Sequence, residues 1–349
     1  MLKNGGMETH VVMMAGGIGS RFWPMSTPGC PKQFLDVLGV GKTMIQQTYA
    51  RFLPLCPPGN MWVVTGAAYV DLVRAQLPEL PPDHILAEPV ARNTAPCIAY
   101  ACWRIGRQCP DANIVVTPAD AFIRDVEAFR QVIRMALADT AGSGHIVTVG
   151  IRPDRPETGY GYIHAAAEPA EGVRKVLAFK EKPDFETAVS YLASGQYLWN
   201  AGIFVWRLAT IQAAIRRYVP GIADVMDALA ARAFSAGAVA ELFPACEKIS
   251  IDYAVMEKSP DIYTVPGDFG WSDLGTWGSL LQHADRDGEG NARTGENVRT
   301  FGCTGTVVHV SSLREVVLEG LHDYIVAEKD GRLLVCRLSE EQRIKDFHD

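Results

Sequence analysis

Residues His10 to Leu35 read HVVMMAGGIGSRFWPMSTPGCPKQFL and carry the strongest structural signal in the chain. The apolar run before the glycines is typical of a buried parallel strand. Glycines let the backbone turn tightly and bring its amide groups against a ligand without a Cβ in the way. Arg21 and Lys32 add two cations close to this turn. The turn is therefore expected to hold the phosphates of a nucleotide, through Ala15, Gly16, Gly17 and Gly19.

Two other glycine motifs are excluded by their spacing. A dinucleotide-binding fingerprint needs a third glycine at position 22, where this chain has Phe22. The run Gly39 to Thr43 resembles the end of a P-loop, but that motif needs a glycine at the position of Asp36. We interpret this second run as a polar hairpin that leads into a helix beginning at Thr43.

Composition excludes several classes of protein. The chain has 349 residues, 48% of them hydrophobic, and a formal net charge of −7, which argues against nucleic acid as a partner. Eight cysteines form no C-x-x-C pair and no ligand-like cluster with histidine, which indicates a cytoplasmic protein without zinc. No run approaches the ~18 apolar residues of a membrane span, and the start has no signal-peptide pattern, so we expect no membrane association.

Strand and helix patterns alternate through the first 150 residues. Apolar strand runs occur at 61–65, 85–87, 113–117 and 146–150, and helical spacing occurs at 67–77, 94–108 and 126–138. This alternation predicts an α/β fold with a mostly parallel, Rossmann-like sheet and helices on both faces. Ligands of such sheets bind at the carboxyl ends of the strands, so Gly16, Glu88 and Asp120 are expected along one edge.

The second half of the chain changes character after Trp277. Before it, strands are expected at 174–179 and 202–206, and helices at 185–194 and 209–219. After it, the remaining runs read as short strands at 306–310, 315–320, 324–328 and 332–338. We therefore predict two domains, 8–285 and a small β-rich domain at 286–349. Its polar, helix-like end (Glu340 to His348) suits contacts between two copies, so a homodimer is expected.

The run GGIGSRFWPMS, followed by PKQF, closely resembles the first motif of the sugar-1-phosphate nucleotidylyltransferases, and within them that of the mannose-1-phosphate guanylyltransferases. Further matching runs follow in the same order and extend the resemblance over almost the whole chain. It implies the nucleotide-diphospho-sugar transferase fold, with a catalytic domain at 8–285 and a left-handed β-helix-like tail. It also implies the reaction of GTP with mannose 1-phosphate, which gives GDP-mannose and pyrophosphate.

In this reaction a sugar-phosphate oxygen attacks the α-phosphorus of GTP, so the main tasks are charge neutralisation and in-line positioning. By resemblance, Arg21 contacts the triphosphate and Lys32 reaches the reacting phosphates. Asp120, in the run PAD, and Asp273, in the run GWSDLGTW, are the implied ligands of Mg²⁺. The metal would bridge the α-phosphate and the sugar phosphate and screen their repulsion.

The run EPVARNTAP, residues 88–96, is expected to read the guanine base. Glu88 could accept from the guanine N1–H and the exocyclic amine, and Arg92 or Asn93 could meet the carbonyl edge. The alternative is that Asn93 or Thr94 caps the helix that follows, and either residue could do both.

Three later runs resemble the sugar-binding motifs of the family: ETGYGYI at 157–163, FKEKP at 179–183 and LWNAGIF at 198–204. The backbone at Gly161 could approach a hexose ring, and Glu181 could accept from a sugar hydroxyl. Lys182 is expected at the sugar phosphate. Asn200 can donate and accept at once. The alternative for all three runs is an ordinary strand or turn role.

One departure from the family pattern is Ala121, where relatives usually carry histidine after the metal-binding aspartate. Two alternatives to the predicted activity stay open. The substrate could be another sugar 1-phosphate, such as a manno-heptose or fucose 1-phosphate, or the protein could be a catalytically silent regulatory homologue. The β-rich tail is too short for a cupin-type isomerase domain, so no isomerase activity is expected.

Overall fold

The computed structural model describes residues 7–17, 19–167, 172–312 and 315–347. The chain forms two compact units, which are described separately. The large unit comprises Met1–Gly16, Tyr49–Ala119 and Ile123–Trp271, and the small unit comprises Gly17–Thr48, Asp120–Phe122 and Ser272–Asp349. Neither unit is continuous in sequence, and the domain boundary expected at residues 285 and 286 stays a prediction.

A nine-stranded sheet forms the centre of the large unit, in the order β3-β2-β1-β4-β9-β6-β10-β8-β7. Strands β3, β2, β1 and β4 are parallel neighbours, and β9 lies antiparallel between β4 and β6. The α/β fold is therefore confirmed, with antiparallel strands inserted beyond β4. The strands are β1 (Thr9–Ala15), β2 (Met61–Gly66), β3 (Ile85–Glu88), β4 (Asn113–Pro118), β6 (Ile146–Ile151), β7 (Tyr162–Ala165), β8 (Arg174–Lys180), β9 (Tyr197–Arg207) and β10 (Ile262–Gly267).

Parallel pairing aligns the carboxyl ends of β3, β2, β1 and β4 along one edge of this sheet. At that edge β1 ends at Ala15, β3 at Glu88 and β4 at Pro118. The glycine turn begins directly after β1, and Asp120 follows β4 after one intervening residue. The strand ends thus share one edge, as the alternation predicts.

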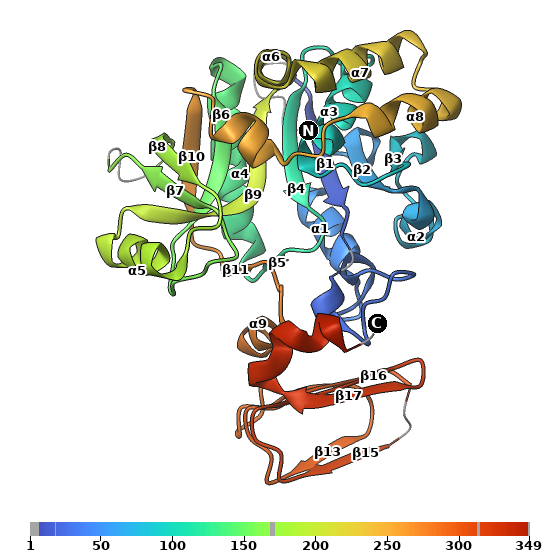
Figure 1. The fold of residues 1–349 in the computed structure, drawn as a ribbon, viewed down its shortest axis with the longest axis vertical. Helices are drawn as coiled ribbons and strands as arrows, with labels where there is room; N and C mark the ends of the chain where they lie inside the picture. Colours follow the sequence, from blue (N-terminus) through green and yellow to red (C-terminus); the bar gives the residue numbers. More distant parts are fainter. Residues whose placement is uncertain (1–6, 18, 168–171, 313–314, 348–349) are drawn as a thin grey trace. The chain divides into compact units, whose positions relative to one another are not determined.

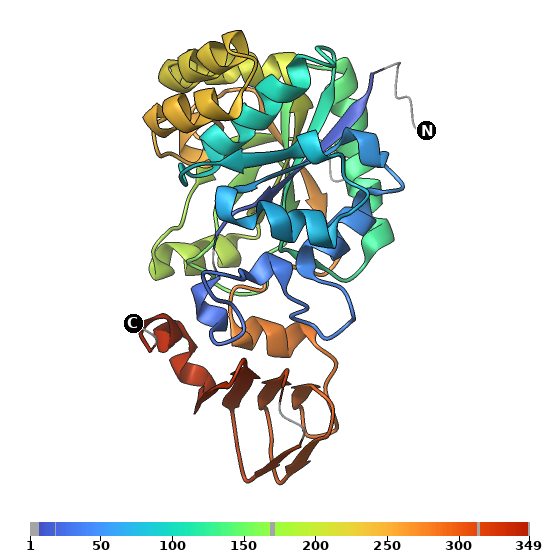
Figure 2. The same ribbon diagram turned by 90° about the vertical axis from the view of Figure 1, so that its right-hand side faces the viewer.

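Helices cover both faces of the sheet, as Figures 1 and 2 show. Val12 of β1 packs into the core formed with helices α3, α6 and α7, whereas α4 packs on β4, β6, β9 and β10. No helix within the described residues combines the length and apolarity that crossing a membrane requires. The helices are α1 (Met44–Phe52), α2 (Val70–Gln76), α3 (Thr94–Gly106), α4 (Val126–Gly142), α5 (Phe185–Ser194), α6 (Leu208–Tyr218), α7 (Pro220–Ala231), α8 (Ala236–Leu242) and α9 (Trp277–His283).

The C-terminal part of the small unit is a short parallel coil of strands (Figure 2). Successive strands alternate between two parallel sheets, β12-β14-β16 and β13-β15, and β17 adds an antiparallel edge to β16. Asp330 and Gly331, both with positive φ, make the two-residue turn between β16 and β17. These strands are β12 (Ala292–Thr294), β13 (Val298–Phe301), β14 (Val307–Val310), β15 (Val316–Glu319), β16 (Tyr324–Lys329) and β17 (Arg332–Arg337).

The small unit has a core of its own, to which an early segment of the chain and its last part both contribute. Phe22, from the segment after the glycine turn, packs against Trp277 of α9 with their ring centroids 5.1 Å apart. Val307 and Ile325 of the coil belong to the same apolar cluster. This core brings the glycine turn and the segment around Asp273 into one compact body.

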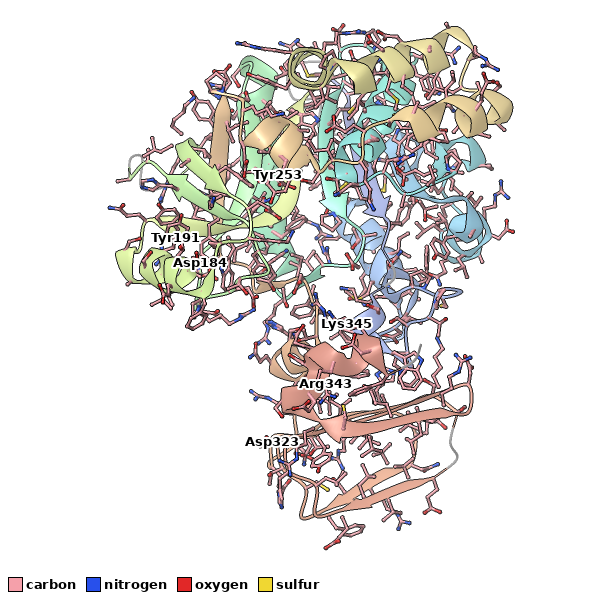
Figure 3. All side chains as sticks on the ribbon, viewed as in Figure 1. Asp184, Tyr191, Tyr253, Asp323, Arg343 and Lys345 are labelled. Atoms are coloured by element: carbon pink, nitrogen blue, oxygen red, sulfur yellow. The ribbon has the colours of Figure 1, made fainter. Side chains whose placement is uncertain are left out.

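The predicted polar end of the chain is a 3-10 helix, Leu338–Asp346. Arg343 and Lys345 lie on this helix (Figure 3). His348, the last residue of the predicted segment, lies outside the described residues. The homodimer stays a prediction.

Candidate active site

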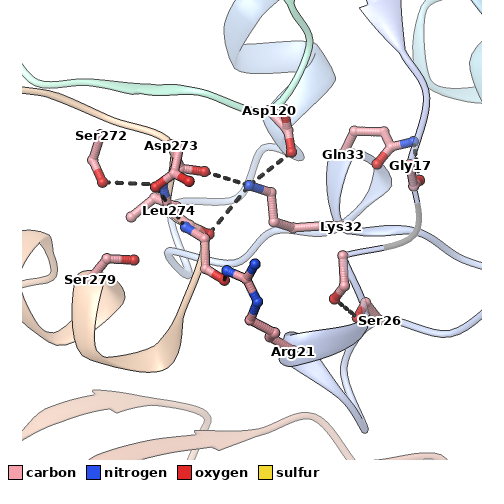
Figure 4. Close-up of polar contacts among 12 residues, drawn as sticks. Gly17, Arg21, Ser26, Lys32, Gln33, Asp120, Ser272, Asp273, Leu274 and Ser279 are labelled. Atoms are coloured by element: carbon pink, nitrogen blue, oxygen red, sulfur yellow. Dashed lines mark hydrogen bonds and ion pairs between the residues drawn. The ribbon is translucent and has the colours of Figure 1, made fainter. Parts of the chain in front are cut away.

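A buried ammonium group joins three segments of the small unit (Figure 4). Lys32 Nζ lies 2.8 Å from Asp120 Oδ2, and it donates to the backbone oxygens of Asp273 and Leu274 at 2.6 and 3.2 Å. The side chain of Lys32 is only 5% exposed. An ammonium has three N–H donors, so these contacts use all of them. Lys32 therefore fixes the two predicted metal ligands beside the glycine turn.

Arg21 lies next to this cluster and is exposed (Figure 4). Its Nη1 donates to the Gly275 carbonyl at 3.2 Å. A guanidinium carries five N–H donors in a planar fork that matches phosphate oxygens. Because the neighbouring Phe22 is buried against Trp277, the backbone of Arg21 is anchored while its charged end is accessible to an anion.

Two buried polar side chains hold the glycine turn, and the spacing of residues in the sequence did not predict this role for them. Ser26 Oγ donates to the Gly19 carbonyl at 2.5 Å, and Gln33 Nε2 donates to the Gly17 carbonyl at 3.2 Å. These contacts fix the backbone of the turn at Gly17 and Gly19. Gly19 has φ of 68°, and a Cβ there would lie 2.7 Å from Lys32 Cβ, so only glycine fits. Ile18 lies outside the described residues.

The donors offered by Asp120 and Asp273 suit a hard divalent cation. Both offer carboxylate oxygens, the ligand type that Mg²⁺ prefers. Asp273 Oδ1 accepts the Gly275 N–H at 3.0 Å, and Asp120 Oδ2 already faces the Lys32 ammonium. Each carboxylate has about four lone-pair sites, so both keep capacity for a metal. The residues fit Mg²⁺.

The predicted base-reading residues lie in the large unit, around the end of β3. Glu88 Oε1 is buried and has no hydrogen-bond partner among the described residues. Burial raises the pKa of Glu88 to about 8. Arg92 Nη2 donates to the Pro244 carbonyl, and its Nε is buried without a partner within the same described part of the chain. Glu88 and Arg92 thus each keep one buried polar atom that a ligand could pair with.

Asn93 and Thr94 have structural roles at the start of α3. Asn93 Oδ1 accepts the Thr94 N–H at 2.8 Å, which makes Asn93 the cap of this helix. Thr94 Oγ1 accepts the Ile251 N–H at 2.9 Å. The capping interpretation therefore describes Asn93, and any contact of either residue with a base stays a prediction.

The predicted sugar-binding residues are also brought together in the large unit. The Asn200 N–H donates to the Gly161 carbonyl at 2.8 Å, and Lys182 Nζ lies 2.5 Å from Glu181 Oε1. A Cβ at Gly161 would lie 2.5 Å from Glu181 Oε2 and 3.4 Å from Asn200 Cβ, so the backbone at Gly161 lies close to both side chains. Three runs that lie far apart in the sequence thus form one cluster of two charges, an amide and a bare backbone.

Comparison with known proteins identifies the family. The family profile described as Nucleotidyl transferase matches residues 10–289. This chain belongs to that family. It is 39% identical to the xanthan biosynthesis protein XanB of Xanthomonas campestris pv. campestris (strain B100), over 96% of this chain and 71% of that protein. It is 37% identical to the mannose-1-phosphate guanylyltransferase of Escherichia coli (strain K12), over 97% of this chain and 72% of that protein.

A solved structure agrees with this assignment to the nucleotidyl transferases. It is titled mannose-1-phosphate geranyltransferase, from Thermus thermophilus, and it superposes with a TM-score of 0.87 at 30% identity. The match covers 97% of this chain and 98% of that chain. The fold predicted from the strand and helix pattern is therefore the fold of this transferase family.

One member of the sugar cluster gives no signal in the sequence of this transferase. Asp252 Oδ1 accepts from Asn200 Nδ2 at 3.0 Å, although the two residues are 52 positions apart. Asp252 begins a π-helix, Asp252–Met256, a form often found at functional sites. Only the folded chain reveals this carboxylate.

A second group also escapes sequence spacing, at the opposite end of β1 from the glycine turn. Ligand atoms of Glu8, His10 and Cys109 lie within 4.8 Å of one another. His10 Nδ1, however, accepts the indole N–H of Trp62 at 3.1 Å. The neutral ring then carries its proton on Nε2 and offers no lone pair there, which disfavours a metal. This geometry gives no support for a zinc site in the transferase.

Proposed function

We propose that this nucleotidyl transferase is a mannose-1-phosphate guanylyltransferase, which converts GTP and mannose 1-phosphate to GDP-mannose and pyrophosphate. The observation that carries the proposal is the cluster in which Lys32 holds Asp120 and Asp273 beside the exposed Arg21. Two cations and two carboxylates in one place suit phosphoryl chemistry at a metal-bound triphosphate. The similarity to the guanylyltransferase of Escherichia coli supports this choice within the family.

In this mechanism the enzyme neutralises charge and positions the reactants in line, and no covalent nucleophile is needed. Arg21 binds the triphosphate and stabilises the pyrophosphate as it leaves. Lys32 keeps Asp120 and Asp273 in place and adds a fixed positive charge at the reacting phosphates. Asp120 and Asp273 would hold Mg²⁺, which when bound supplies charge to screen the repulsion between the two phosphate groups.

Guanine selection is assigned to Glu88. With its pKa raised to about 8, Glu88 keeps its proton near neutral pH in the free enzyme. The N1–H and the exocyclic amine of guanine would stabilise the ionised carboxylate, which accepts from both, whereas adenine does not present that pair of donors. The unpaired Glu88 Oε1 supports this role, because a buried acceptor without a partner favours a ligand that supplies the donor. Arg92 is the second candidate contact to the base.

The sugar phosphate is assigned to the cluster of Gly161, Glu181, Lys182 and Asn200. Lys182 binds the phosphate, and Glu181 accepts from a sugar hydroxyl. Asn200 Oδ1 already accepts from Thr148 Oγ1 and from the Gly202 N–H, so its spare capacity is one amide N–H. Asn200 therefore donates to the sugar, although its residue type alone allows both donation and acceptance.

We further propose that the enzyme is a cytoplasmic homodimer. All eight cysteines are free, which suits a reducing compartment. The polar 3-10 helix at the end of the small unit supports contacts between copies. Light scattering of the purified protein tests the dimer, and a molar mass of one chain would contradict it.

The experiment that tests the activity is pyrophosphate release with Mg²⁺ over a matrix of nucleoside triphosphates and sugar 1-phosphates. We expect turnover only with GTP and mannose 1-phosphate. Turnover of GTP with a manno-heptose or fucose 1-phosphate would keep the mechanism and change the substrate. Absence of turnover with every pair would favour the silent homologue, with Ala121 as the first residue to revert to histidine.

A further inference from the structure

We propose that Asp252 is a positioning residue of the sugar-phosphate site, which fixes the Asn200 amide so that one N–H stays available to the sugar. This inference rests on the proposed function, because it concerns the site assigned above to mannose 1-phosphate. Asp252 belongs to none of the runs that resemble family motifs, and it joins the site only through the fold.

The hydrogen bonds of Asn200 define which end of its amide faces each partner. The Gly202 N–H can only donate, so the atom that it meets at 3.2 Å must be the amide oxygen. The Asp252 carboxylate accepts, so the atom 3.0 Å from Oδ1 must be the amide nitrogen. Thr148 Oγ1 supplies a second donor to the amide oxygen at 3.0 Å. One amide N–H is left over, and Asp252 holds the nitrogen that bears it.

The charges around Asp252 suit this role. Burial and the negative charge of Glu181 raise the pKa of Asp252 to about 6, and the positive charge of Lys182 opposes that rise. Lys182 lies against Glu181, with φ of 46°, a backbone conformation that non-glycine residues seldom adopt. Glu181 thus contacts the Lys182 ammonium directly, and the negative charge of Asp252 also attracts it.

The segment that carries Asp252 is anchored to the start of α3, next to the predicted base-reading run. The Ile251 N–H donates to Thr94 Oγ1 at 2.9 Å, and the Ala95 N–H donates to the Ile249 carbonyl at 3.1 Å. Tyr253, the next residue, is 46% exposed (Figure 3), whereas Asp252 is partly buried against Asn200. The segment thus gives Asn200 a support from a different part of the chain.

The test compares steady-state kinetics of Asp252→Ala, Asp252→Asn, Asn200→Ala and the double variant D252A/N200A with the wild type. Asp252→Ala should raise KM for mannose 1-phosphate roughly tenfold, as loss of one charge-assisted hydrogen bond predicts, and leave KM for GTP unchanged. Asp252→Asn should recover most of this loss, because its amide oxygen still accepts from Asn200. The double variant should be no worse than Asn200→Ala.

Asp227→Ala is the matched control. Asp227 accepts from Trp103 Nε1 at 2.7 Å and pairs with Arg216, elsewhere in the large unit. Its loss should affect thermal stability without changing KM for either substrate. An unchanged KM for mannose 1-phosphate in Asp252→Ala would overturn the inference and leave the proposed function intact. The inference would also be overturned if the losses of Asp252→Ala and Asn200→Ala added up in the double variant. A KM for GTP that rises as much as the KM for mannose 1-phosphate would overturn it as well.

The wild type distinguishes this failure from a failure of the proposed function. If it uses a different sugar 1-phosphate with GTP, the proposed substrate is wrong, and the same comparison of KM values is made with that sugar. If it turns over no pair at all, the proposed function and this inference are both overturned.

Discussion

The residues expected at the phosphates and those expected at the base and sugar differ in how far their polar atoms are already paired. In the small unit, Lys32 has all three donors engaged and Asp120 faces an opposite charge. In the large unit, Glu88 keeps a buried oxygen without a partner in the described chain, and Asn200 keeps one amide N–H. The Lys32 ammonium is fully paired before any ligand arrives, whereas Glu88 and Asn200 each keep a polar atom for one.

This difference matches the two tasks of a transferase. Charge stabilisation of a transition state works best when its groups are fixed in advance, because no reorganisation is then needed during the reaction. Discrimination between substrates works best when a site leaves a polar atom that only the correct ligand satisfies. We call Lys32, Asp120 and Asp273 the paired set, and Glu88 and Asn200 the unpaired set. Changes in the paired set should therefore reduce kcat, and changes in the unpaired set should alter substrate preference.

The largest expected effect is loss of the charge on Asp273. Asp273→Asn keeps an acceptor for the Gly275 N–H and removes the negative charge that would hold Mg²⁺. We expect kcat for pyrophosphate release to fall at least about a thousandfold with little change in melting temperature. Asp323→Asn, an exposed position in the same unit, is the control. Wild-type turnover in Asp273→Asn would contradict the metal assignment.

A smaller loss is expected at Gly19, where the paired set depends on a bare backbone. Gly19→Ala places a methyl group 2.7 Å from Lys32 Cβ at φ of 68°, so Lys32 must shift away from its carbonyl partners. We expect kcat to fall roughly ten- to a hundredfold, since misplacing a catalytic group by an ångström has this order of effect. Gly29→Ala is the control. A Cβ at Gly29 would lie 4.0 Å from Thr27 Oγ1, so this variant should have wild-type rates. Equal rates in both variants would show that the position of Lys32 is unimportant.

Much of the fold is predictable because its strands are short apolar runs between clear breaks. The strands β1, β2, β4 and β6 and helix α5 lie where the pattern places them. By contrast, β9 begins at Tyr197, five residues before the predicted strand, because Gly202 with φ of 68° interrupts its alternation. The sequence pattern did not predict helices α7 and α8. Helix α7 begins at Pro220, a residue that usually breaks a helical pattern, and α8 has only seven residues.

The site is predictable where its residues lie in one run and not where the fold joins distant runs. Arg21, Lys32 and the glycines follow one another closely, so a single motif reveals them. The contact of Asp252 with Asn200 and that of Lys32 with the Leu274 carbonyl span 52 and 242 positions, and neither leaves a spacing signal. Ser26 and Gln33 lie inside the first motif, but only their burial shows that they hold it.

In the unpaired set, Glu88→Gln should change which nucleotide is used. The amide offers one acceptor oxygen in place of two and introduces a donor that opposes the guanine N1–H. We expect the ratio of kcat/KM for GTP to that for ATP to fall about tenfold, with kcat for GTP reduced less than in the metal-site variant. Glu186→Gln, an exposed position on α5, should keep the ratio. A uniform fall in kcat with an unchanged ratio would place Glu88 in the paired set instead.

The smallest expected effect is on stability, and it reports the unpaired state of Glu88 directly. Its folded pKa is about 8, above the ordinary value of 4.5, so between these values the unfolded chain has lost a proton that the folded chain keeps. The unfolded state then binds fewer protons, and stability must fall as pH rises through this window. Without ligand, the wild type should lose a few degrees of melting temperature relative to Glu88→Gln between pH 5 and pH 8. Glu186→Gln should follow the wild type at both pH values. If wild type and Glu88→Gln instead stay parallel, the Glu88 carboxylate is already paired in the free enzyme, and the contrast between the two sets disappears.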